Sequence, residues 1–295
     1  MGTQVIVTEQ QPGAELTGKQ FHIFGSGISF SMSPTIHNAA FKHHQLPHFY
    51  DIRESPGIDG VAHLIQDGRF GGASVTMPHK LQVHKYCDEI TETAESIGAI
   101  NTLVVKSKDG KRFIMGDNTD WSGLYNIMRN HIDKTGRKPE TGLVIGAGGA
   151  SRAALYSLYR AQVKDIYLVN RTQSKAEGVQ EAFKSLFTIK VIQSLEDLPM
   201  KPDIIVGTIP ADTTTEARFA NIFGAQGLCI EMAYKPRITP LLKMAQRHPG
   251  WETVTGVEVL LSQAFDQYLS WTNKEAPKEI MLDAVMAHER RPAAL

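Results

Sequence analysis

Short apolar runs alternate with amphipathic stretches along most of the chain. In the first hundred residues, apolar runs predict strands at 21–25, 48–54 and 71–77, and helix-like spacing predicts helices at 33–45, 58–66 and 79–87. Strands that alternate with helices in this way are typical of a parallel sheet covered by helices. The pattern therefore predicts an α/β fold for this part of the chain.

The segment 99–118 has a different pattern. Two strand-like runs flank Lys108-Asp109-Gly110, and Asp-Gly between such runs is a hairpin signal. A helix is predicted to follow Asp120, and the polar stretch 133–142, which contains Gly and Pro, reads as a linker. We expect a domain boundary in this linker region.

The second half resumes the alternation after a glycine-rich turn, GAGGAS, residues 146–151. An apolar strand from 142 leads into this turn, and an alanine-rich helix follows it up to 161. Further strands are predicted at 165–172, 188–192, 203–211 and 227–234, with a helix at 174–186. In Rossmann-type domains such a turn lets the backbone approach the pyrophosphate of a dinucleotide at a helix N-terminus.

The turn departs from the strict GxGxxG pattern, because Ser151 stands at the third glycine. Its position between a strand and a helix is nevertheless the one that the pyrophosphate-binding mechanism requires. We therefore expect a dinucleotide site formed by Gly146, Ala147, Gly148, Gly149 and Ala150. The alternative is a plain strand-to-helix turn without cofactor.

The end of the next strand bears on the choice of cofactor. The strand ends in Asn170, Arg171 and Thr172, with Lys175 close behind, and no carboxylate is present to hold a ribose 2′-hydroxyl. An arginine there can stack on adenine and pair with a 2′-phosphate, and the lysine adds charge. The sequence therefore favours NADP, with NAD as the alternative.

Composition excludes several other classes. Thirty-one basic residues balance thirty-one acidic ones, so broad electrostatic binding to nucleic acid or to an anionic membrane is not expected. No apolar run reaches the length of a membrane span, and the N-terminus lacks the pattern of a secretory signal. Cys87 and Cys229 lie far apart, which fits a reducing cytosol, and no metal-ligand spacing occurs. We expect a cytoplasmic protein without metal that acts on a small molecule.

Three segments carry candidate side-chain chemistry. Ser33 followed by Pro34 predicts a capped helix start, but Ser31 is one residue too early to cap the same helix, so a clamp for a carboxylate or phosphate is the other possibility. Lys80 ends VTMPHK just past a strand, and Asp120 ends GDNTD at a helix start. Each could carry a proton for a hydride-transfer enzyme. Each could equally be a surface lysine or a helix cap.

Eight motifs together resemble the shikimate and quinate dehydrogenase family. FSMSP, VTMPHK, GAINT, GDNTD, VIGAGGASRA, VNRT, AYKPRITPLL and GVEVLLSQA occur in that family's order, from about Phe21 to Trp271. The segment EMAYKPRITPLL is particularly similar to the dehydrogenase domain of the fungal pentafunctional shikimate-pathway polypeptide, and stand-alone fungal quinate dehydrogenases are also similar.

The resemblance implies a role for each matching residue. Lys80 and Asp120 would be the catalytic pair beside the C3 hydroxyl, and the ring carboxylate would be held by Ser31 and Ser33. The ring hydroxyls would be bound by Thr76, Asn101 and Gln263, with Tyr234 near the substrate. On the cofactor side the implied set is Gly256 at the nicotinamide, Thr208 in the strand-end segment GTIP, and Asn170, Arg171, Thr172 and Lys175 at the adenosine phosphate.

The resemblance also implies a two-domain α/β fold. We expect a substrate-binding and catalytic domain at 1–122, a Rossmann-type domain at 123–253, and C-terminal helices at 254–295 that return to the first domain. Several positions depart from the common family pattern: Gly27, Phe30, Ser74 and the segment Gly207–Pro210. They do not decide whether the substrate is shikimate, which Ser33 and Thr76 favour, or quinate. The alternative function is a catalytically silent ligand sensor, against which the intact Lys80, Asp120 and glycine turn argue.

Overall fold

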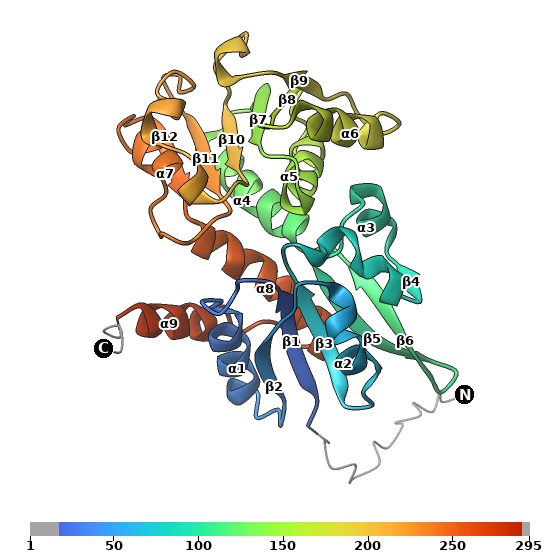
Figure 1. Ribbon diagram of the computed structural model, residues 1–295. Coiled ribbons are helices and arrows are strands. Elements are labelled where there is room, and N and C mark those ends of the chain that lie inside the picture. Colours follow the sequence, from blue (N-terminus) through green and yellow to red (C-terminus); the bar gives the residue numbers. More distant parts are fainter. Residues whose placement is uncertain (1–17, 291–295) are drawn as a thin grey trace, which may run out of the picture.

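The computed structural model describes residues 18–290, in which two six-stranded sheets form two lobes, one above the other (Figure 1). The prediction about a secretory signal lies outside the described residues. The first sheet has the order β2-β1-β3-β5-β6-β4. Its strands are β1 (Gln20–Gly25), β2 (Phe49–Glu54), β3 (Phe70–Val75), β4 (Glu89–Ile90), β5 (Thr102–Lys108) and β6 (Lys111–Asp117).

The first sheet is mixed. β1, β2 and β3 pair in parallel, β5 runs antiparallel to both β3 and β6, and the short β4 pairs in parallel with β6. The hairpin predicted at Asp109-Gly110 joins β5 to β6, and both turn residues have positive φ. The helices of this lobe are α1 (Ser33–His43), α2 (Ala62–Gln66) and α3 (Glu92–Ile97), with the 3-10 helices η1 (Ile58–Val61), η2 (His79–Leu81) and η3 (Val83–Tyr86).

The second sheet has the order β12-β11-β10-β7-β8-β9, and all its strands are parallel. They are β7 (Thr141–Ile145), β8 (Asp165–Val169), β9 (Lys190–Ile192), β10 (Ile204–Gly207), β11 (Gly227–Glu231) and β12 (Trp251–Val254). β7, β10 and β11 are buried along their whole length, as expected for parallel strands covered on both faces. This confirms the predicted Rossmann-type domain.

The helices of the second lobe cover both faces of its sheet. They are α4 (Asp120–Thr135), α5 (Gly149–Arg160), α6 (Gln173–Phe183) and α7 (Pro240–Ala245), with the 3-10 helices η4 (Leu195–Asp197), η5 (Ala211–Thr213) and η6 (Glu216–Phe219). One apolar cluster lies between the sheet and α4, α5 and α6, and a second lies under α7. Among the described residues, no helix combines the length and the apolar character that crossing a membrane requires.

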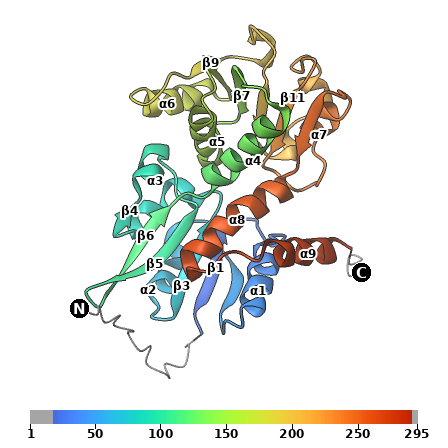
Figure 2. The same cartoon turned by 180° about the vertical axis from the view of Figure 1, so that it is seen from behind.

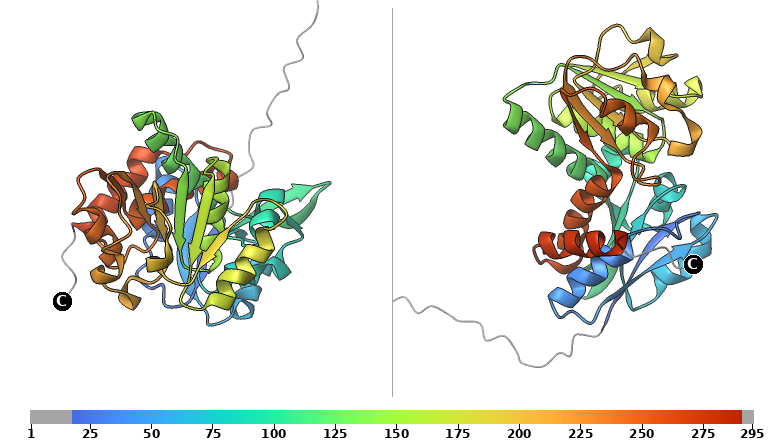
Figure 3. Two further views of the ribbon diagram at one scale, coloured as in Figure 1. Left: turned by 90° about the horizontal axis from the view of Figure 1, so that it is seen from above. Right: turned by 90° about the vertical axis from the view of Figure 1, so that its left-hand side faces the viewer.

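The C-terminal helices connect the lobes. α8 (Gly256–Thr272) contacts α4 and β11 of the second lobe, and then α1, β3 and β5 of the first (Figure 2). α9 (Lys278–Glu289) packs on α1, and the side view shows α4 and α8 together along one side of the two sheets (Figure 3). The expectation that the chain returns to the first lobe is confirmed.

Some predicted elements were wrong in their boundaries or type. The helix expected at 79–87 is instead two 3-10 helices. The carbonyl of Lys80 accepts a hydrogen bond from the Ile100 N–H (2.9 Å), so it is not free for a continuous α-helix. The pattern also missed β4, α3, α7 and β12. The polar stretch 133–142 is a shorter connection than predicted, because α4 continues to Thr135.

Candidate active site

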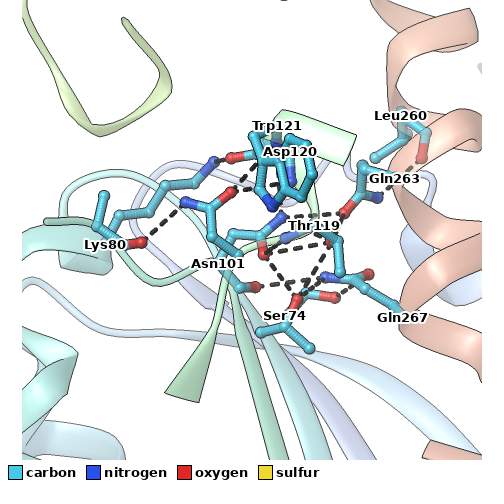
Figure 4. A network of polar contacts seen from close by, with 12 residues as sticks. Ser74, Lys80, Asn101, Thr119, Asp120, Trp121, Leu260, Gln263 and Gln267 are labelled. Carbon is cyan, nitrogen blue, oxygen red and sulfur yellow. Dashed lines mark hydrogen bonds and ion pairs between the residues drawn. The ribbon is translucent and has the colours of Figure 1, made fainter. Parts of the chain in front are cut away.

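Lys80 and Asp120 meet where the two lobes join. Lys80 lies in η2 just after β3, and Asp120 is the first residue of α4. The Lys80 Nζ donates a hydrogen bond to Asp120 Oδ2 in an ion pair, and their side chains are only 13% and 7% exposed. Figure 4 shows the two side chains pointing toward one another. The surface-lysine interpretation of Lys80 is therefore wrong.

Asp120 is also not the cap of its helix. Thr119 occupies that position and makes no side-chain capping bond, whereas Asn118 Oδ1 accepts from the Asp120 N–H at 3.0 Å. The carboxylate is thereby released from a capping role and is free to face Lys80.

Asn101 and Gln263 complete a polar group around Asp120 (Figure 4). The Asn101 side-chain N–H₂ donates to Asp120 Oδ1 at 2.9 Å and to Gln263 Oε1 at 3.2 Å. Gln263 reaches this group from α8 because α4 and α8 pack closely at Gly123, where a Cβ would lie 2.8 Å from the backbone nitrogen of Gln263. Glycine at this crossing therefore allows α4 and α8 to contribute to a single site.

Ser31 and Ser33 lie side by side at the start of α1. Their hydroxyl oxygens are 3.3 Å apart, and Ser31 Oγ accepts from the Ser33 N–H at the same distance. The helix therefore begins at Ser33 with Met32 as its cap residue, so the prediction that Ser33 caps the helix was wrong. Ser31 supports the helix start instead, and both hydroxyls remain together at a helix N-terminus that favours an anion.

Tyr234 and Phe30 lie beside this serine pair, and Thr76 lies just after the end of β3 in the same lobe. Tyr234, in the loop after β11, packs against the apolar core of the first lobe and meets Phe30 edge to face, with ring centroids 5.6 Å apart. Burial raises the pKa of Tyr234, and the neighbouring Ser31 hydroxyl partly opposes that increase. Thr76 follows β3, and its backbone N–H donates to the Phe24 carbonyl at 2.9 Å. Tyr234 therefore brings the second lobe to the serine pair.

The glycine-rich turn lies against Lys80. Gly146 has φ +119°, and a Cβ there would lie 2.4 Å from Thr208 Oγ1, so the backbone conformation and the space both require glycine. A Cβ on Gly149 would lie 2.9 Å from the Cβ of Lys80. Ser151 at the third glycine position closes the turn, because its Oγ accepts from the Gly148 N–H at 3.0 Å and lies 2.7 Å from Thr208 Oγ1. Ala147 and Ala150 lie in the same turn.

A cavity of about 220 Å³ extends from the glycine turn. Of the four residues expected at the adenosine phosphate, Asn170 and Arg171 line this cavity, whereas Thr172 and Lys175 are not among its lining residues. Arg218 of η6, which the sequence reasoning missed, lines it from the opposite segment. Among the described residues that line this cavity, none carries a carboxylate. This glycine turn and cavity fit a nicotinamide dinucleotide.

Gly256 begins α8 beside the loop after β11. A Cβ at Gly256 would lie 2.5 Å from the carbonyl oxygen of Ala233, so the loop that carries Tyr234 lies directly against the start of this helix. Glu231 anchors the loop: Thr239 Oγ1 donates to one carboxylate oxygen at 2.9 Å, and the Ala233 N–H donates to the other at 3.1 Å. Burial raises the pKa of Glu231 to about 7. The acid at the end of the apolar run GLCIE was a signal that the sequence reasoning did not use.

Within residues 18–290, no three His, Cys, Asp or Glu side chains come together as a metal site would require. The chemistry-bearing groups are instead a lysine–carboxylate pair, amides and hydroxyls, beside a glycine turn. These features define a two-domain α/β protein of the Rossmann type.

Comparisons with known proteins name the family. A model of the shikimate dehydrogenase substrate binding domain matches residues 23–103, and a model of shikimate/quinate 5-dehydrogenase matches 132–219. The pentafunctional AROM polypeptide of Malassezia globosa is 39% identical over 291 residues, which are 95% of this chain and 18% of that protein. The chain thus spans about a fifth of the length of the curated relatives it matches. The chain belongs to the shikimate/quinate dehydrogenase family of oxidoreductases.

Solved structures agree with this assignment. The dehydroquinate dehydratase and shikimate dehydrogenase region of the Schizosaccharomyces pombe AROM protein is 36% identical, with a TM-score of 0.76, and the match covers 92% of this chain and 53% of that one. A shikimate dehydrogenase solved in complex with NADP⁺ is 26% identical, with a TM-score of 0.78, and the match covers 96% and 100% of the two chains. Both similarities extend over nearly the whole chain.

Proposed function

We propose that this chain is an NADP-dependent dehydrogenase that reversibly oxidises the C3 hydroxyl of shikimate, with quinate as the alternative ring. The observation that carries the proposal is that Lys80, which pairs with Asp120, lies directly against Gly149 of the glycine turn. A hydride-transfer enzyme needs its proton-carrying group next to its dinucleotide site, because proton and hydride leave neighbouring atoms of the substrate. The family assignment and the relative solved with NADP⁺ support the same function.

The substrate would be held from both lobes. We place its carboxylate at Ser31 and Ser33, where two hydroxyls and the N-terminus of α1 favour an anion. The ring hydroxyls would be bound by Thr76, Asn101 and Gln263, and Tyr234 would cover the ring from the second lobe. This arrangement uses neutral donors and acceptors for the hydroxyls, which suits a small polyhydroxy acid.

Lys80 and Asp120 would take part in the transfer of the C3 hydroxyl proton. The dinucleotide, when bound, supplies the hydride acceptor. The Lys80 ammonium, held in place by Asp120, stabilises the negative charge that develops on the C3 oxygen. In the oxidation direction the hydroxyl proton leaves to water when Lys80 is an ammonium, or to Lys80 when its amine is neutral, and in the reduction direction the Lys80 ammonium donates a proton to the C3 oxygen. Asn101 keeps the Asp120 carboxylate oriented by donating to Oδ1, so that Oδ2 faces the lysine.

The cofactor site would use Gly146–Ala150, Thr208 and Gly256 for the pyrophosphate and nicotinamide ends. Asn170 and Arg171 would contact the adenosine 2′-phosphate, and Thr172 and Lys175 complete the predicted set. The predicted division into units 1–122, 123–253 and 254–295 belongs to this proposal, with the substrate in the first unit and the dinucleotide in the second.

The test is a matrix of activity measurements. The purified chain is mixed with shikimate or quinate and with NADP⁺ or NAD⁺, and absorbance of the reduced nicotinamide is followed. We expect the highest kcat/KM with shikimate and NADP⁺. A higher kcat/KM with quinate or NAD⁺ would correct the ring or the cofactor. Binding of a ring acid without turnover in any combination would overturn the proposal and support a silent ligand sensor.

A further inference from the structure

A series of buried hydrogen bonds runs from the first sheet to the candidate active site. It starts at Tyr50 of β2, whose hydroxyl donates to Ser74 Oγ at 2.6 Å. The Ser74 hydroxyl donates to Gln267 Oε1 of α8 at 2.9 Å. Tyr50 and Gln267 are completely buried, and Ser74 is nearly so. These three residues connect the first sheet to the helix that crosses between the lobes.

The series of hydrogen bonds continues to the carboxylate of Asp120. Gln267 Nε2 donates to Thr102 Oγ1 at 2.9 Å, and the Thr102 hydroxyl donates to Asn101 Oδ1 at 2.7 Å. The Asn101 amide then donates to Asp120 Oδ1 at 2.9 Å. Every group donates in the same direction, from Tyr50 toward Asp120. Figure 4 shows Ser74, Gln267, Asn101 and Asp120 in this arrangement.

Backbone groups fix the orientation of both amides. The Thr119 N–H donates to Asn101 Oδ1 at 2.7 Å, so that atom is the oxygen. Gln267 Nε2 also donates to the backbone carbonyl of Asn101 at 3.3 Å, so that atom is the nitrogen. Flipping either amide would place two donors or two acceptors against each other. The donor-to-acceptor direction of this series of hydrogen bonds is therefore set by the backbone groups that contact the two amides.

Such a series is costly to bury unless every member is paired, and apolar side chains could fill the same volume without that cost. We propose that Ser74 and Gln267 are positioning residues for the reaction: they orient Thr102, which holds Asn101 with its amide N–H₂ toward Asp120. This inference rests on the proposed function. It assigns Ser74, one of the positions that depart from the family pattern, as the link between the first sheet and Gln267.

The consequence is a defined geometry at the Lys80–Asp120 pair. With Gln267 Nε2 donating to it, the Thr102 oxygen is an acceptor on that side, and its hydroxyl donates to Asn101 Oδ1 at 2.7 Å, a shorter contact than the 3.3 Å to Thr119 Oγ1. Without Gln267 Nε2, that hydroxyl can rotate, and the Asn101 amide loses one of the bonds that hold it against Asp120. The Asp120 carboxylate can then turn away from Lys80, which slows the chemical step more than it weakens ring binding.

The experiment compares four variants of the full chain with the wild type, using shikimate and NADP⁺. Gln267→Met removes both polar ends at similar length, and Ser74→Ala removes the hydroxyl that donates to Gln267. Ser74→Thr keeps that hydroxyl. Ser157→Ala is the matched control, because Ser157 is also buried and its hydroxyl donates to the Ala153 and Trp121 carbonyls at 2.7 and 2.9 Å, outside this series of hydrogen bonds.

We expect Gln267→Met to lower kcat about tenfold, which corresponds to the loss of about one buried hydrogen bond. Ser74→Ala should lower kcat about threefold, because it removes only the donor to Gln267. In both variants KM for shikimate should rise less than about twofold. Ser74→Thr should recover most of the loss, and Ser157→Ala should leave kcat unchanged. If Ser74→Ala lowers the melting temperature but leaves kcat like that of the control, the inference is wrong, even if Gln267→Met does not fold. A wild-type chain without turnover overturns the proposed function and this inference together, whereas an active wild type with unaffected variants overturns the inference alone.

Discussion

The two sheets of this chain use their interiors differently. The second sheet is entirely parallel, and its central strands are buried along their whole length and mostly apolar, with Thr141 and Glu231 as polar residues at strand ends. The first sheet is mixed, and buried polar side chains lie at or just beside the ends of its strands, among them Ser74, Asn101 and Thr102. The second sheet therefore presents a site made largely of backbone, at the glycine turn. The first presents a site made of side chains, in which each buried polar group needs a partner.

This difference teaches where substitutions should act. A backbone site tolerates side-chain changes unless they fill the space that glycine leaves open, whereas a side-chain site depends on individual functional groups. Effects on turnover should therefore concentrate in the first lobe and its contact with α4 and α8. Effects on cofactor choice and on stability should concentrate in the second.

The largest effect is expected at Lys80. Lys80→Ala removes the ammonium that faces Asp120 and should lower kcat by a factor on the order of 100, because charge stabilisation and proton transfer are both lost. The measurement is steady-state turnover with shikimate and NADP⁺. Lys85→Ala is the control, since Lys85 pairs with Asp59 at the surface of the same segment. Equal turnover in both variants would remove Lys80 from the chemistry.

The second prediction concerns the buried carboxylate of Glu231 in the second lobe. Burial raises its pKa from 4.5 to about 7, so the folded state holds a proton that the unfolded state releases between these values. This contribution to stability is complete below about pH 4.5 and is lost as the pH rises through about 7. Glu231→Gln should therefore be more stable than the wild type at about pH 8, by on the order of 2 kcal/mol, with little difference at about pH 4.

Urea unfolding at several pH values measures this dependence. Glu252→Gln provides the matched control, because hydrogen bonding to His131 lowers the pKa of Glu252 and its pH dependence has the opposite sign. A stability difference between Glu231→Gln and the wild type that stays constant with pH would show that Glu231 does not titrate as its burial implies.

The third prediction separates the two cofactors. Arg171→Ala should weaken NADP⁺ binding about tenfold and leave NAD⁺ binding nearly unchanged, because the lost ion pair would involve only the 2′-phosphate. Calorimetric titration with each cofactor measures both affinities. Arg129→Ala, at an exposed ion pair on α4, is the control. Equal losses for NADP⁺ and NAD⁺ would mean that Arg171 does not recognise the phosphate.

The smallest effect is expected where the lobes touch beside the serine pair. The Lys235 ammonium lies 4.6 Å from the centroid of the Phe30 ring, which is 41% exposed. Lys235→Gln should raise KM for shikimate two- to threefold at low salt, because a cation near the carboxylate site is lost and such exposed contacts are weak. Lys278→Gln, which removes a similar contact with Phe265, should leave KM unchanged. An identical KM in both variants would exclude a role for Lys235.

Sequence reasoning succeeded where a local pattern has one structural solution. The strand leading into Gly146 and the helix after it follow from apolar periodicity and glycine alone. It failed where distant segments take part in the local structure: in the 3-10 helices around Lys80, the Lys80 carbonyl accepts a hydrogen bond from the N–H of Ile100. The short strands β4 and β12 carry too few residues to show a period.

The candidate site shows the same limit. Lys80 and Asp120 could be proposed from motifs, but only the fold shows that η2 and the start of α4 bring them together. Gln267 was missed because it stands in a helix where nothing local distinguishes it from other buried positions. Its hydrogen bonds run to Ser74 and Thr102, far away in sequence. Arg218 was missed for the same reason, since a 3-10 helix places it at the cavity.

The central claim is that the C3 carbon of the ring lies between the Lys80–Asp120 pair and the glycine turn, and that hydride passes there directly to the dinucleotide. Its most direct test is isotope transfer: the chain is incubated with NADP⁺ and shikimate deuterated at C3, and the reduced dinucleotide is analysed by mass spectrometry. The account predicts one deuterium in the reduced dinucleotide. Reduced dinucleotide without deuterium would contradict it.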